Sequence, residues 1–383
     1  MLEGTNVVLG VSGSIAAVKT VELAHELRRE GAAVRAVMTG AAQGIIHPWS
    51  LEYATGTEVV TEITGKVEHV ELCGNDGWAD VLLLAPATAN TVGKIANAVD
   101  DTPVTTCATT ALGAGIPVVC APAMHEPMYD HPGVLESLDK LEAWGVGFVD
   151  PHVEEGKAKI ATEEAIVLET ARHAGDGALA GRTVIVTSGG TSEPIDPVRV
   201  LSNRASGRTG RAVARACYAR GADVVLVHDG SDVPYATVER VETAAEMLAA
   251  VQAHAPDADA LVSAAAISDY TVTPADAKIR SGKELTLDLE PTPKLIDTIR
   301  EEYPEMAIVG FKLETADDDA ALVEKARETL ERADLSFVVA NHAGVLGTNG
   351  TRAFIVRADD VGEYEGEKAG LGRRIADELA GEI

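Results

Sequence analysis

The sequence predicts an α/β protein made of two doubly wound domains, each with a mostly parallel sheet. Short apolar runs alternate with amphipathic segments, which is the pattern of strands and helices in such folds. The strand–turn–helix pattern that begins at Asn6 begins again at Arg182. A length of 383 residues is enough for two domains of ordinary size.

The first domain opens with a βαβ unit. Residues 6–10 form an apolar run that predicts a strand, and residues 12–14 form a Ser/Gly turn. Apolar residues then recur at helical spacing up to Gly31, and residues 33–38 read as the next strand. Further apolar runs at 81–84 and 116–120 suit a parallel sheet that is covered on both faces.

The second domain repeats this order. Residues 182–187 predict a strand, 188–191 a turn, 210–220 a helix of small residues and 221–227 another strand. The segment between the two patterns is rich in glycine and alanine. We therefore expect domains at 1–174 and 182–383, joined by a linker at 175–181. Ligands of such folds bind at the carboxyl ends of the strands, so the turns that follow strands are the places to search.

Composition excludes several classes of protein. The 46% of hydrophobic residues support folded cores, but no apolar run reaches the roughly 18 residues of a membrane span. The start of the chain lacks the basic segment of a signal peptide. Four scattered cysteines show no metal-binding spacing and suit a reducing, cytoplasmic setting.

The charge balance is strongly acidic, with a formal net charge of −28. General binding to nucleic acid is disfavoured, because phosphate backbones require a basic surface. The excess of acids is either ordinary acidic solubility or an adaptation to a salt-rich, halophilic cytoplasm, where ions screen the repulsion. We favour salt adaptation, because acids crowd even the short loop at 314–319.

Two turns of the first domain carry hydroxyl groups at the start of a helix. One comprises Ser12, Gly13 and Ser14, and the other runs from Thr88 to Thr91. Helix N-termini favour anions, so a phosphate-bearing cofactor is one reading of these turns, and tight turns with capped helices are the other. Neither turn matches GxxxxGKS or GxGxxG. His69 and the proline-rich loop at 122–129 are further candidates.

Together these pieces resemble the flavin-dependent cysteine decarboxylases, in particular the decarboxylases of phosphopantothenoylcysteine. The match covers the GVSGSIA start at 10–16, the TANT loop at 88–91, His69 before Val70-Glu71-Leu72, and the PAM segment at 122–124. The resemblance implies flavin mononucleotide (FMN) as cofactor, His69 as the catalytic acid or base, and Met124 and His125 at the substrate carboxylate. It assigns FMN binding to Ser12, Gly13, Ser14, Thr39, Thr88, Ala89, Asn90 and Thr91.

The implied chemistry places the difficult step on the cofactor. The flavin oxidises the thiol side of the substrate, carbon dioxide leaves, and the reduced flavin returns the electrons. Two positions depart from the family pattern. His125 replaces an asparagine, and the segment at 151–160 lacks the cysteine that donates a proton in bacterial members, although Lys157 and Lys159 there could meet a phosphate.

The second domain carries a cluster of arginines within an acidic chain. Residues 196–211 include Arg199, Arg204, Arg208 and Arg211, and the cluster opens a helix after a glycine-rich turn. A solvated basic loop is one reading, and an anion site at the start of a helix is the other.

This segment resembles the phosphopantothenate–cysteine ligases, whose DPVR and SN motifs match residues 196–199 and 202–203. The resemblance implies an acyl-cytidylate intermediate made from cytidine triphosphate (CTP), with Mg²⁺ bridging the phosphates, although no metal ligand is assigned. Asn203 and Lys278 would be catalytic, and Arg199 and Arg208 would bind the substrate phosphate. It assigns CTP binding to Ser263, Ala264, Ala265, Asp269, Lys278, Pro293, Lys294, Leu295, Ile296, Phe311 and Arg327.

The resemblance therefore implies a bifunctional enzyme of coenzyme A synthesis, of archaeal type, with two Rossmann-like halves. It also implies a homo-oligomer, a dodecamer of decarboxylase trimers and ligase dimers, that acts on small molecules. Alternatives are a ligase fused to a regulatory flavin-binding domain and a flavin enzyme with another substrate. A nicotinamide dehydrogenase is disfavoured, because no GxGxxG follows a strand.

Overall fold

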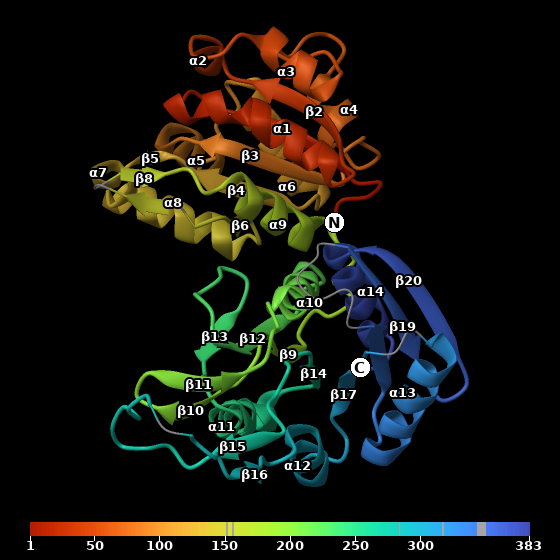
Figure 1. Ribbon diagram of the computed structural model, residues 1–383. Coiled ribbons are helices and arrows are strands. Elements are labelled where there is room, and N and C mark those ends of the chain that lie inside the picture. Colours follow the sequence, from red (N-terminus) through yellow and green to blue (C-terminus); the bar gives the residue numbers. More distant parts are fainter. Residues whose placement is uncertain (151, 155–156, 283, 316–317, 343–349) are drawn as a thin grey trace. The chain divides into compact units, whose positions relative to one another are not determined.

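The computed structural model describes all residues except 151, 155–156, 283, 316–317 and 343–349 (Figure 1). Two compact units divide the chain, Met1–Asp176 and Gly177–Ile383. Leu179 is fully buried in a core cluster of the second unit, and its N–H donates to the carbonyl of Arg220 at 2.9 Å. Within the segment expected as a linker, Leu179 packs into the second unit, whereas Ala180 and Gly181 are exposed.

The first unit has a parallel sheet of five strands in the order β2-β1-β3-β4-β6. The strands are β1 Asn6–Val11, β2 Ala33–Met38, β3 Val81–Ala87, β4 Val118–Pro122 and β6 Gly147–Phe148. From β1 the chain adds β2 on one side of that strand. It then crosses back and adds β3, β4 and β6 in turn on the other side. This reversal between β1 and β3 makes the doubly wound fold, and it places the carboxyl ends of both strands at a switch point.

Helices cover both faces of this sheet (Figure 1). On one side α1 packs against α3 and α9, and on the other α6 packs against α4 and α5, and α5 against α8. The bounds are η1 Ile15–Lys19, α1 Thr20–Arg29, α2 Gly40–Gln43, α3 Pro48–Thr55, α4 Glu68–Cys73, α5 Ala89–Ala96, α6 Pro103–Ala114, α7 Glu126–Tyr129, α8 Pro132–Ala143 and α9 Glu163–Ala174. A small sheet of β5 Met124–His125, β8 Lys157–Lys159 and β7 His152–Glu154 is added at the edge.

The second unit has a sheet of eight strands in the order β13-β12-β9-β14-β17-β18-β19-β20. Pairing is parallel from β13 to β18 and antiparallel from β18 to β20. The strands are β9 Thr183–Thr187, β12 Asp223–His228, β13 Thr237–Arg240, β14 Ala260–Ser263, β17 Ala307–Glu314, β18 Phe337–His342, β19 Gly350–Val356 and β20 Val361–Glu367.

Two layers of helices bury the two faces of this sheet. Along β9, Val184 and Val186 lie in the core cluster that holds α10 and α14, whereas Ile185 lies in the cluster that holds α11, α12 and α13. This alternation is the period of two of a strand. The helices are α10 Arg208–Ala219, α11 Ala244–His254, η2 Ala255–Asp257, α12 Leu295–Glu302, α13 Asp319–Ala333 and α14 Lys368–Ala380.

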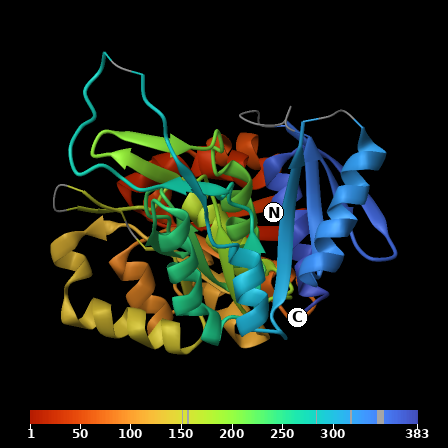
Figure 2. The same ribbon diagram turned by 60° about the horizontal axis from the view of Figure 1, so that its bottom comes forward.

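Two short hairpins extend from the second sheet (Figure 2). One pairs β10 Ser192–Asp196 with β11 Arg199–Ser202, and the other pairs β15 Tyr270–Val272 with β16 Leu289–Pro291. No helix in the described part of the chain is both long and apolar enough to cross a membrane. The predicted class, two α/β domains with mostly parallel sheets, is confirmed.

Candidate active sites

The predicted flavin-binding residues of the first unit gather at the carboxyl ends of its parallel strands. Ser12 follows β1, Thr39 follows β2 and Thr88 follows β3. The three side chains come from turns that are distant in the sequence, and the fold brings those turns to one edge of the sheet. This is the edge at which doubly wound proteins bind ligands.

Ser12 joins two of these turns directly. Its hydroxyl donates to the carbonyl of Pro86 at 2.7 Å and accepts from the N–H of Thr88 at 3.1 Å. The side chain is buried, so both bonds are shielded from water. The structure therefore uses the Ser12 hydroxyl to fix the turns, and leaves the exposed Asn90 and the half-buried Ser14 nearer to solvent.

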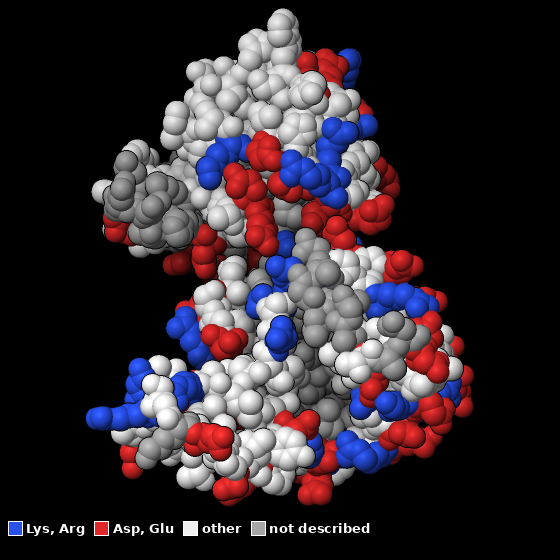
Figure 3. All heavy atoms as spheres, viewed as in Figure 1, with Lys and Arg blue, Asp and Glu red and all other residues white. Residues whose placement is uncertain are grey.

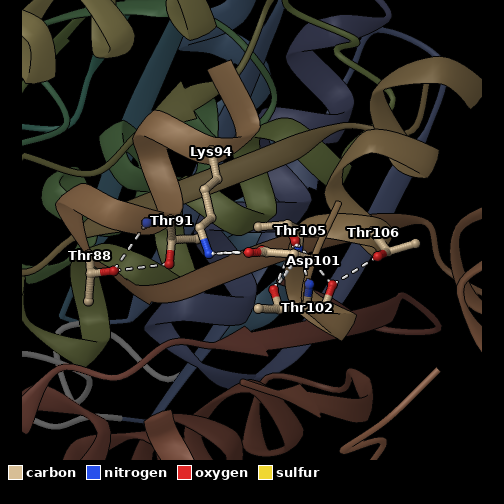
Figure 4. Close-up of polar contacts among 7 residues, drawn as sticks. All are labelled: Thr88, Thr91, Lys94, Asp101, Thr102, Thr105 and Thr106. Atoms are coloured by element: carbon tan, nitrogen blue, oxygen red, sulfur yellow. Dashed lines mark hydrogen bonds and ion pairs between the residues drawn. The ribbon is translucent and has the colours of Figure 1, made fainter. Parts of the chain in front are cut away.

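Thr88 caps α5 (Figure 4). Its Oγ1 accepts from the N–H of Thr91 at 3.2 Å and lies 3.0 Å from the Thr91 hydroxyl. One turn further along the same helix, Lys94 forms an ion pair with Asp101 at 2.6 Å, next to the cap of α6. The helix that begins at the predicted flavin loop is thus fixed at its start and along its side.

Gly13 and Thr39 make a second junction. A Cβ atom on Gly13 would lie 2.5 Å from the Cβ of Ala41, so only glycine allows the first turn to approach α2 this closely. Thr39 caps α2 by accepting from the N–H of Ala42 at 3.2 Å. The backbone N–H of Thr39 donates to the carbonyl of Val11 at 3.0 Å. Both residues shape the rim of the site.

His69 lies in the first turn of α4, a short helix that packs against α6. Its Nδ1 is buried and has no hydrogen-bond partner among the described residues. A buried polar atom without a partner is costly. A ligand that accepts from or donates to this nitrogen would remove that cost, which fits the predicted catalytic role.

Met124 and His125 form β5, directly after β4. Met124 is buried, whereas His125 is exposed at the N-terminus of α7. The strand pairs with β8, with Met124 opposite Ala158 and His125 opposite Lys157. The predicted substrate flap therefore runs along the predicted carboxylate-binding segment, while the side chains of residues 151–159 lie outside the described part.

The arginine-rich segment of the second unit packs around the turn after β9. The Ser188 hydroxyl donates to the carbonyl of Gly207 at 2.8 Å. Gly207 has a positive φ of 68°, and a Cβ on Gly210 would lie 2.6 Å from the Ser188 side chain. Glycine is therefore required at both positions, and α10 begins directly on the turn that follows the first strand.

Asn203 lies at the same edge of the sheet. Its amide donates to the carbonyl of Ala266 at 2.7 Å, in the loop that follows β14. That loop begins at the buried Ser263, and Ala265 donates its N–H to the hydroxyl of Thr187 at 3.2 Å. Ala264 continues the same loop. The structure thus brings the predicted catalytic amide to the predicted CTP loop.

Asp269 and Lys294 form an ion pair at 2.5 Å, with both side chains largely exposed. Pro293 precedes this lysine and is exposed, but the next residues turn inward. Leu295 is buried in the core, and Ile296 packs against the same core cluster. Of the segment predicted to bind CTP, only the first part faces solvent.

The 278–280 segment is tied to the β10–β11 hairpin. The buried Asp196 accepts from the N–H of Ile279 at 3.1 Å, and Arg199 donates to the Ile279 carbonyl at 2.6 Å. Arg199 also pairs with Asp196 at 3.3 Å. Arg199 therefore holds a loop, and Lys278, next to Ile279, is exposed to solvent.

The pKa of Asp196 reflects two opposed effects. Burial raises the pKa of this carboxyl, but the N–H groups of Ile279, Val198 and Arg199 and the Arg199 guanidinium favour the charged form. The pKa lies below its ordinary value, so the carboxylate stays charged at neutral pH. At neutral pH the charged Asp196 carboxylate therefore holds the β10–β11 hairpin to the 278–280 segment.

The other predicted CTP residues lie further along the sheet. Phe311 is half-buried on β17 and packs against the core. Arg327 donates to the carbonyl of Ala358 at 2.8 Å, in the turn between β19 and β20. Lys325 instead pairs with Glu314, at the carboxyl end of β17, at 2.9 Å. Of these two bases, Lys325 lies at the strand end where a ligand is expected.

Lys368 begins α14 and is 8% exposed, which the sequence did not predict. A single lysine at the start of a predicted helix gives no signal, because its burial depends on the packing of α14. Arg208, predicted to bind substrate phosphate, begins α10 and is exposed. In the described part of the chain, no group of three or more His, Cys, Asp or Glu residues could hold a metal ion.

Comparisons with known proteins match each unit separately and the chain as a whole. Residues 1–175 match the model of the Flavoprotein family, and residues 179–382 match that of the DNA/pantothenate metabolism flavoprotein C-terminal domain. Among solved structures, the FMN-dependent cysteine decarboxylase SpaF is 30% identical over 44% of this chain and 99% of its own, with a TM-score of 0.39.

Two curated relatives span nearly the whole chain. The coenzyme A biosynthesis bifunctional protein CoaBC of Thermococcus kodakarensis is 48% identical over 94% of this chain and 90% of its own length. The protein of the same name from Methanocaldococcus jannaschii is 36% identical over 99% of this chain and 94% of its own. The chain therefore belongs to the family of bifunctional coenzyme A biosynthesis proteins, which combine a ligase and a decarboxylase.

Proposed function

We propose that this protein ligates 4′-phosphopantothenate to cysteine with CTP and then decarboxylates the 4′-phosphopantothenoylcysteine to 4′-phosphopantetheine with FMN. The main support is that each half of one chain gathers its own set of polar side chains at the carboxyl ends of its strands. The relatives that match along both halves are named as bifunctional proteins of coenzyme A biosynthesis. The product of the ligase half is the substrate of the other half.

In the ligase half, the carboxylate of phosphopantothenate attacks the α-phosphorus of CTP and releases pyrophosphate. The cysteine amino group then attacks the activated carbonyl, and cytidylate leaves. Asn203, whose amide donates one N–H to the Ala266 carbonyl, would donate its second N–H to the acyl oxygen, where negative charge develops. Lys278 lies on an exposed loop and would contact the phosphates of CTP. Mg²⁺ would supply charge neutralisation there when bound.

In the decarboxylase half, the turns at 12–14, 39 and 88–91 would hold FMN, with the Ser12 hydroxyl fixing two of these turns, and the cofactor would supply oxidation and re-reduction of the substrate's thiol side when bound. The orphaned Nδ1 of His69 fits this reading, since it requires a ligand partner. His69 moves the proton at the substrate thiol. Met124 orients the substrate, and His125 donates to its carboxylate in place of an amide.

The test is a coupled assay on the protein purified in high salt, with phosphopantothenate, cysteine, CTP and magnesium. We expect flavin absorbance, then pyrophosphate release, then carbon dioxide. His69→Asn should abolish carbon dioxide and preserve pyrophosphate release, whereas Asn203→Asp should abolish amide formation. If either variant impairs only the reaction of the other half, the assignment of that residue is wrong.

We also propose that the first unit assembles into homo-oligomers in a salt-rich cytoplasm. Its surface carries exposed Ile15, Trp49 and Tyr53, which are 77%, 73% and 81% exposed, and few charges surround α2 and α3 (Figure 3). Large apolar side chains with this much exposure are candidates for an association surface. Tyr53→Glu should lower the mass measured by light scattering, and an unchanged mass contradicts this surface.

A further inference from the structure

The segment that follows β14 is held against β10 by hydrogen bonds at successive positions, and β10 and β15 lie side by side (Figure 1). Four of these bonds have lengths from 2.8 to 3.1 Å and follow the same order along both segments. They join Thr191 with Ser268, Glu193 with Thr271, Ile195 with Ala275 and Asp196 with Ile279.

Glu193 makes two contacts at once, although its side chain is only 3% exposed. One carboxylate oxygen accepts from the hydroxyl of Thr271, on β15, at 2.9 Å. The other accepts from the N–H of Ala244, the first residue of α11, at 2.9 Å. Because α11 packs against β9 and β12 of the main sheet, this carboxylate links β15 to the fixed part of the unit.

The start of α11 does not explain the second contact of Glu193. A buried carboxylate requires hydrogen-bond donors, and the partial positive charge of a helix N-terminus favours it. However, α11 already has a capping box, in which the Thr243 hydroxyl accepts from the N–H of Glu246 at 3.1 Å. What Glu193 adds is the bond to Thr271, which reaches a different element.

The segment held in this way carries residues that are predicted to bind CTP. Thr271 lies two residues after Asp269. The backbone carbonyl of Asp269 accepts from the N–H of Thr292 at 3.0 Å, on the chain that leads to Lys294. Lys278 lies further along, next to the residue that Asp196 holds. The Glu193 contact therefore acts on Asp269 more directly than on Lys278.

We propose that Glu193 is a positioning residue for nucleotide binding, because its buried carboxylate holds Thr271, and with it Asp269, where the nucleotide meets β15. This rests on the proposed ligase function and adds a residue to it. Without this contact the segment must be ordered when CTP binds, and the cost of ordering lowers affinity. The chemical step depends on Asn203 and Lys278, which other bonds hold, so kcat should change little.

The first test is Thr271→Val, which removes the hydroxyl but keeps the size of the side chain and the Glu193–Ala244 contact. Calorimetry with CTP and magnesium on the full-length protein should give a Kd about fivefold higher than that of the wild type. The KM for CTP should rise with it, while kcat stays within about twofold. Thr271→Ser keeps a hydroxyl and should retain most of the affinity.

Glu193 itself is tested by two substitutions. Glu193→Ala removes both contacts and should weaken CTP binding at least as much as Thr271→Val does. Glu193→Gln keeps both, since its amide oxygen accepts from the Ala244 N–H and its amide nitrogen donates to the Thr271 hydroxyl. We therefore expect Glu193→Gln to bind CTP nearly as the wild type does.

Thr243→Val is the matched control for a loss of stability alone. It is the same chemical change at the start of α11, and it removes the acceptor of the Glu246 N–H. We expect Thr243→Val to lower the melting temperature and to keep the wild-type Kd for CTP. Hydrogen exchange gives a second measurement, because protection of the Thr292 N–H, which donates to Asp269, should fall in Thr271→Val and not in Thr243→Val.

The outcomes separate this inference from the proposed function. If Thr271→Val binds CTP as the wild type does, or if Thr243→Val loses as much affinity, the inference is wrong even when ligation proceeds. If the wild type binds CTP, the Thr271 and Glu193 variants behave as expected, and no amide forms from phosphopantothenate and cysteine, the proposed function fails and the inference stands. A wild type that binds no CTP overturns both.

Discussion

Ser12→Ala tests whether the flavin site depends on the junction between two strand-end turns. The Ser12 hydroxyl donates to the Pro86 carbonyl at 2.7 Å and accepts from the Thr88 N–H at 3.1 Å. Alanine removes both bonds, but the Pro86 carbonyl still accepts from the N–H of residue 12 at 3.2 Å. The Thr88 N–H alone loses its acceptor, and an unsatisfied buried donor costs about 1–3 kcal/mol.

Calorimetry on the full chain measures this loss, with flavin fluorescence identifying the transition of the first unit. For a unit of this size each kcal/mol lowers the melting temperature by about 2–4 °C, so we expect a drop of roughly 2–12 °C. Flavin affinity should fall as well, because the Thr88 turn loses its anchor.

Ser14→Ala is the matched control in the same turn. Its hydroxyl accepts from the Ala16 N–H at 3.3 Å and is half-buried, so the loss should be about 0.5–1 kcal/mol. We expect Ser14→Ala to weaken flavin binding with little change in melting. If the first unit of the Ser12→Ala protein has the same melting temperature as the wild type, the reasoning about the junction is refuted.

Three further predictions concern the second unit and the charge. Gly372→Ala should cost about 1–2 kcal/mol in thermal melts, because backbone atoms of Ala212 meet the new methyl group and outweigh the gain in helix propensity, whereas Gly113→Ala meets nothing within 4 Å and should be neutral or stabilising. The pKa of Asp196 is lowered by its charged tie, so that tie stabilises the fold above the ordinary pKa and is lost as pH falls through the folded pKa; the protection factor of the Ile279 N–H, its exchange relative to an unstructured peptide at the same pH, should therefore fall there, and Asp196→Asn should remove the pH dependence of that protection factor. With a net charge of −28, the melting temperature should rise between 0.1 and about 1 M KCl as screening shortens the range of repulsion, and a flat profile would contradict salt adaptation.

The sequence was sufficient for the fold because its signals are local. Apolar runs marked β1, β3, β9 and β12, and each became a parallel strand with a polar turn at its carboxyl end. The direction in which the chain winds, by contrast, depends on which strands pair. The placement of β3 beside β1 follows from packing on both faces, which a single sequence does not display.

The residues of the sites were harder to sort by role. Leu295 and Lys294 are neighbours in one segment that resembles a nucleotide-binding motif, yet Leu295 is buried and Lys294 is exposed. The difference arises because α12 begins there and turns one face to the sheet. Similarly, the pairing of Ser12 with Thr88 joins residues far apart in the chain, and a hydroxyl that fixes a turn looks the same in sequence as one that contacts a ligand.

The acidic surface limits how this protein can hold anionic substrates. Lys294, which is assigned to the predicted CTP site, already pairs with Asp269, and Lys325 at the end of a neighbouring strand pairs with Glu314. A phosphate that binds these lysines must replace their carboxylate partners. At high salt the exposed lysine–carboxylate pair and the exposed lysine–phosphate pair are both weak, so the exchange gains little free energy.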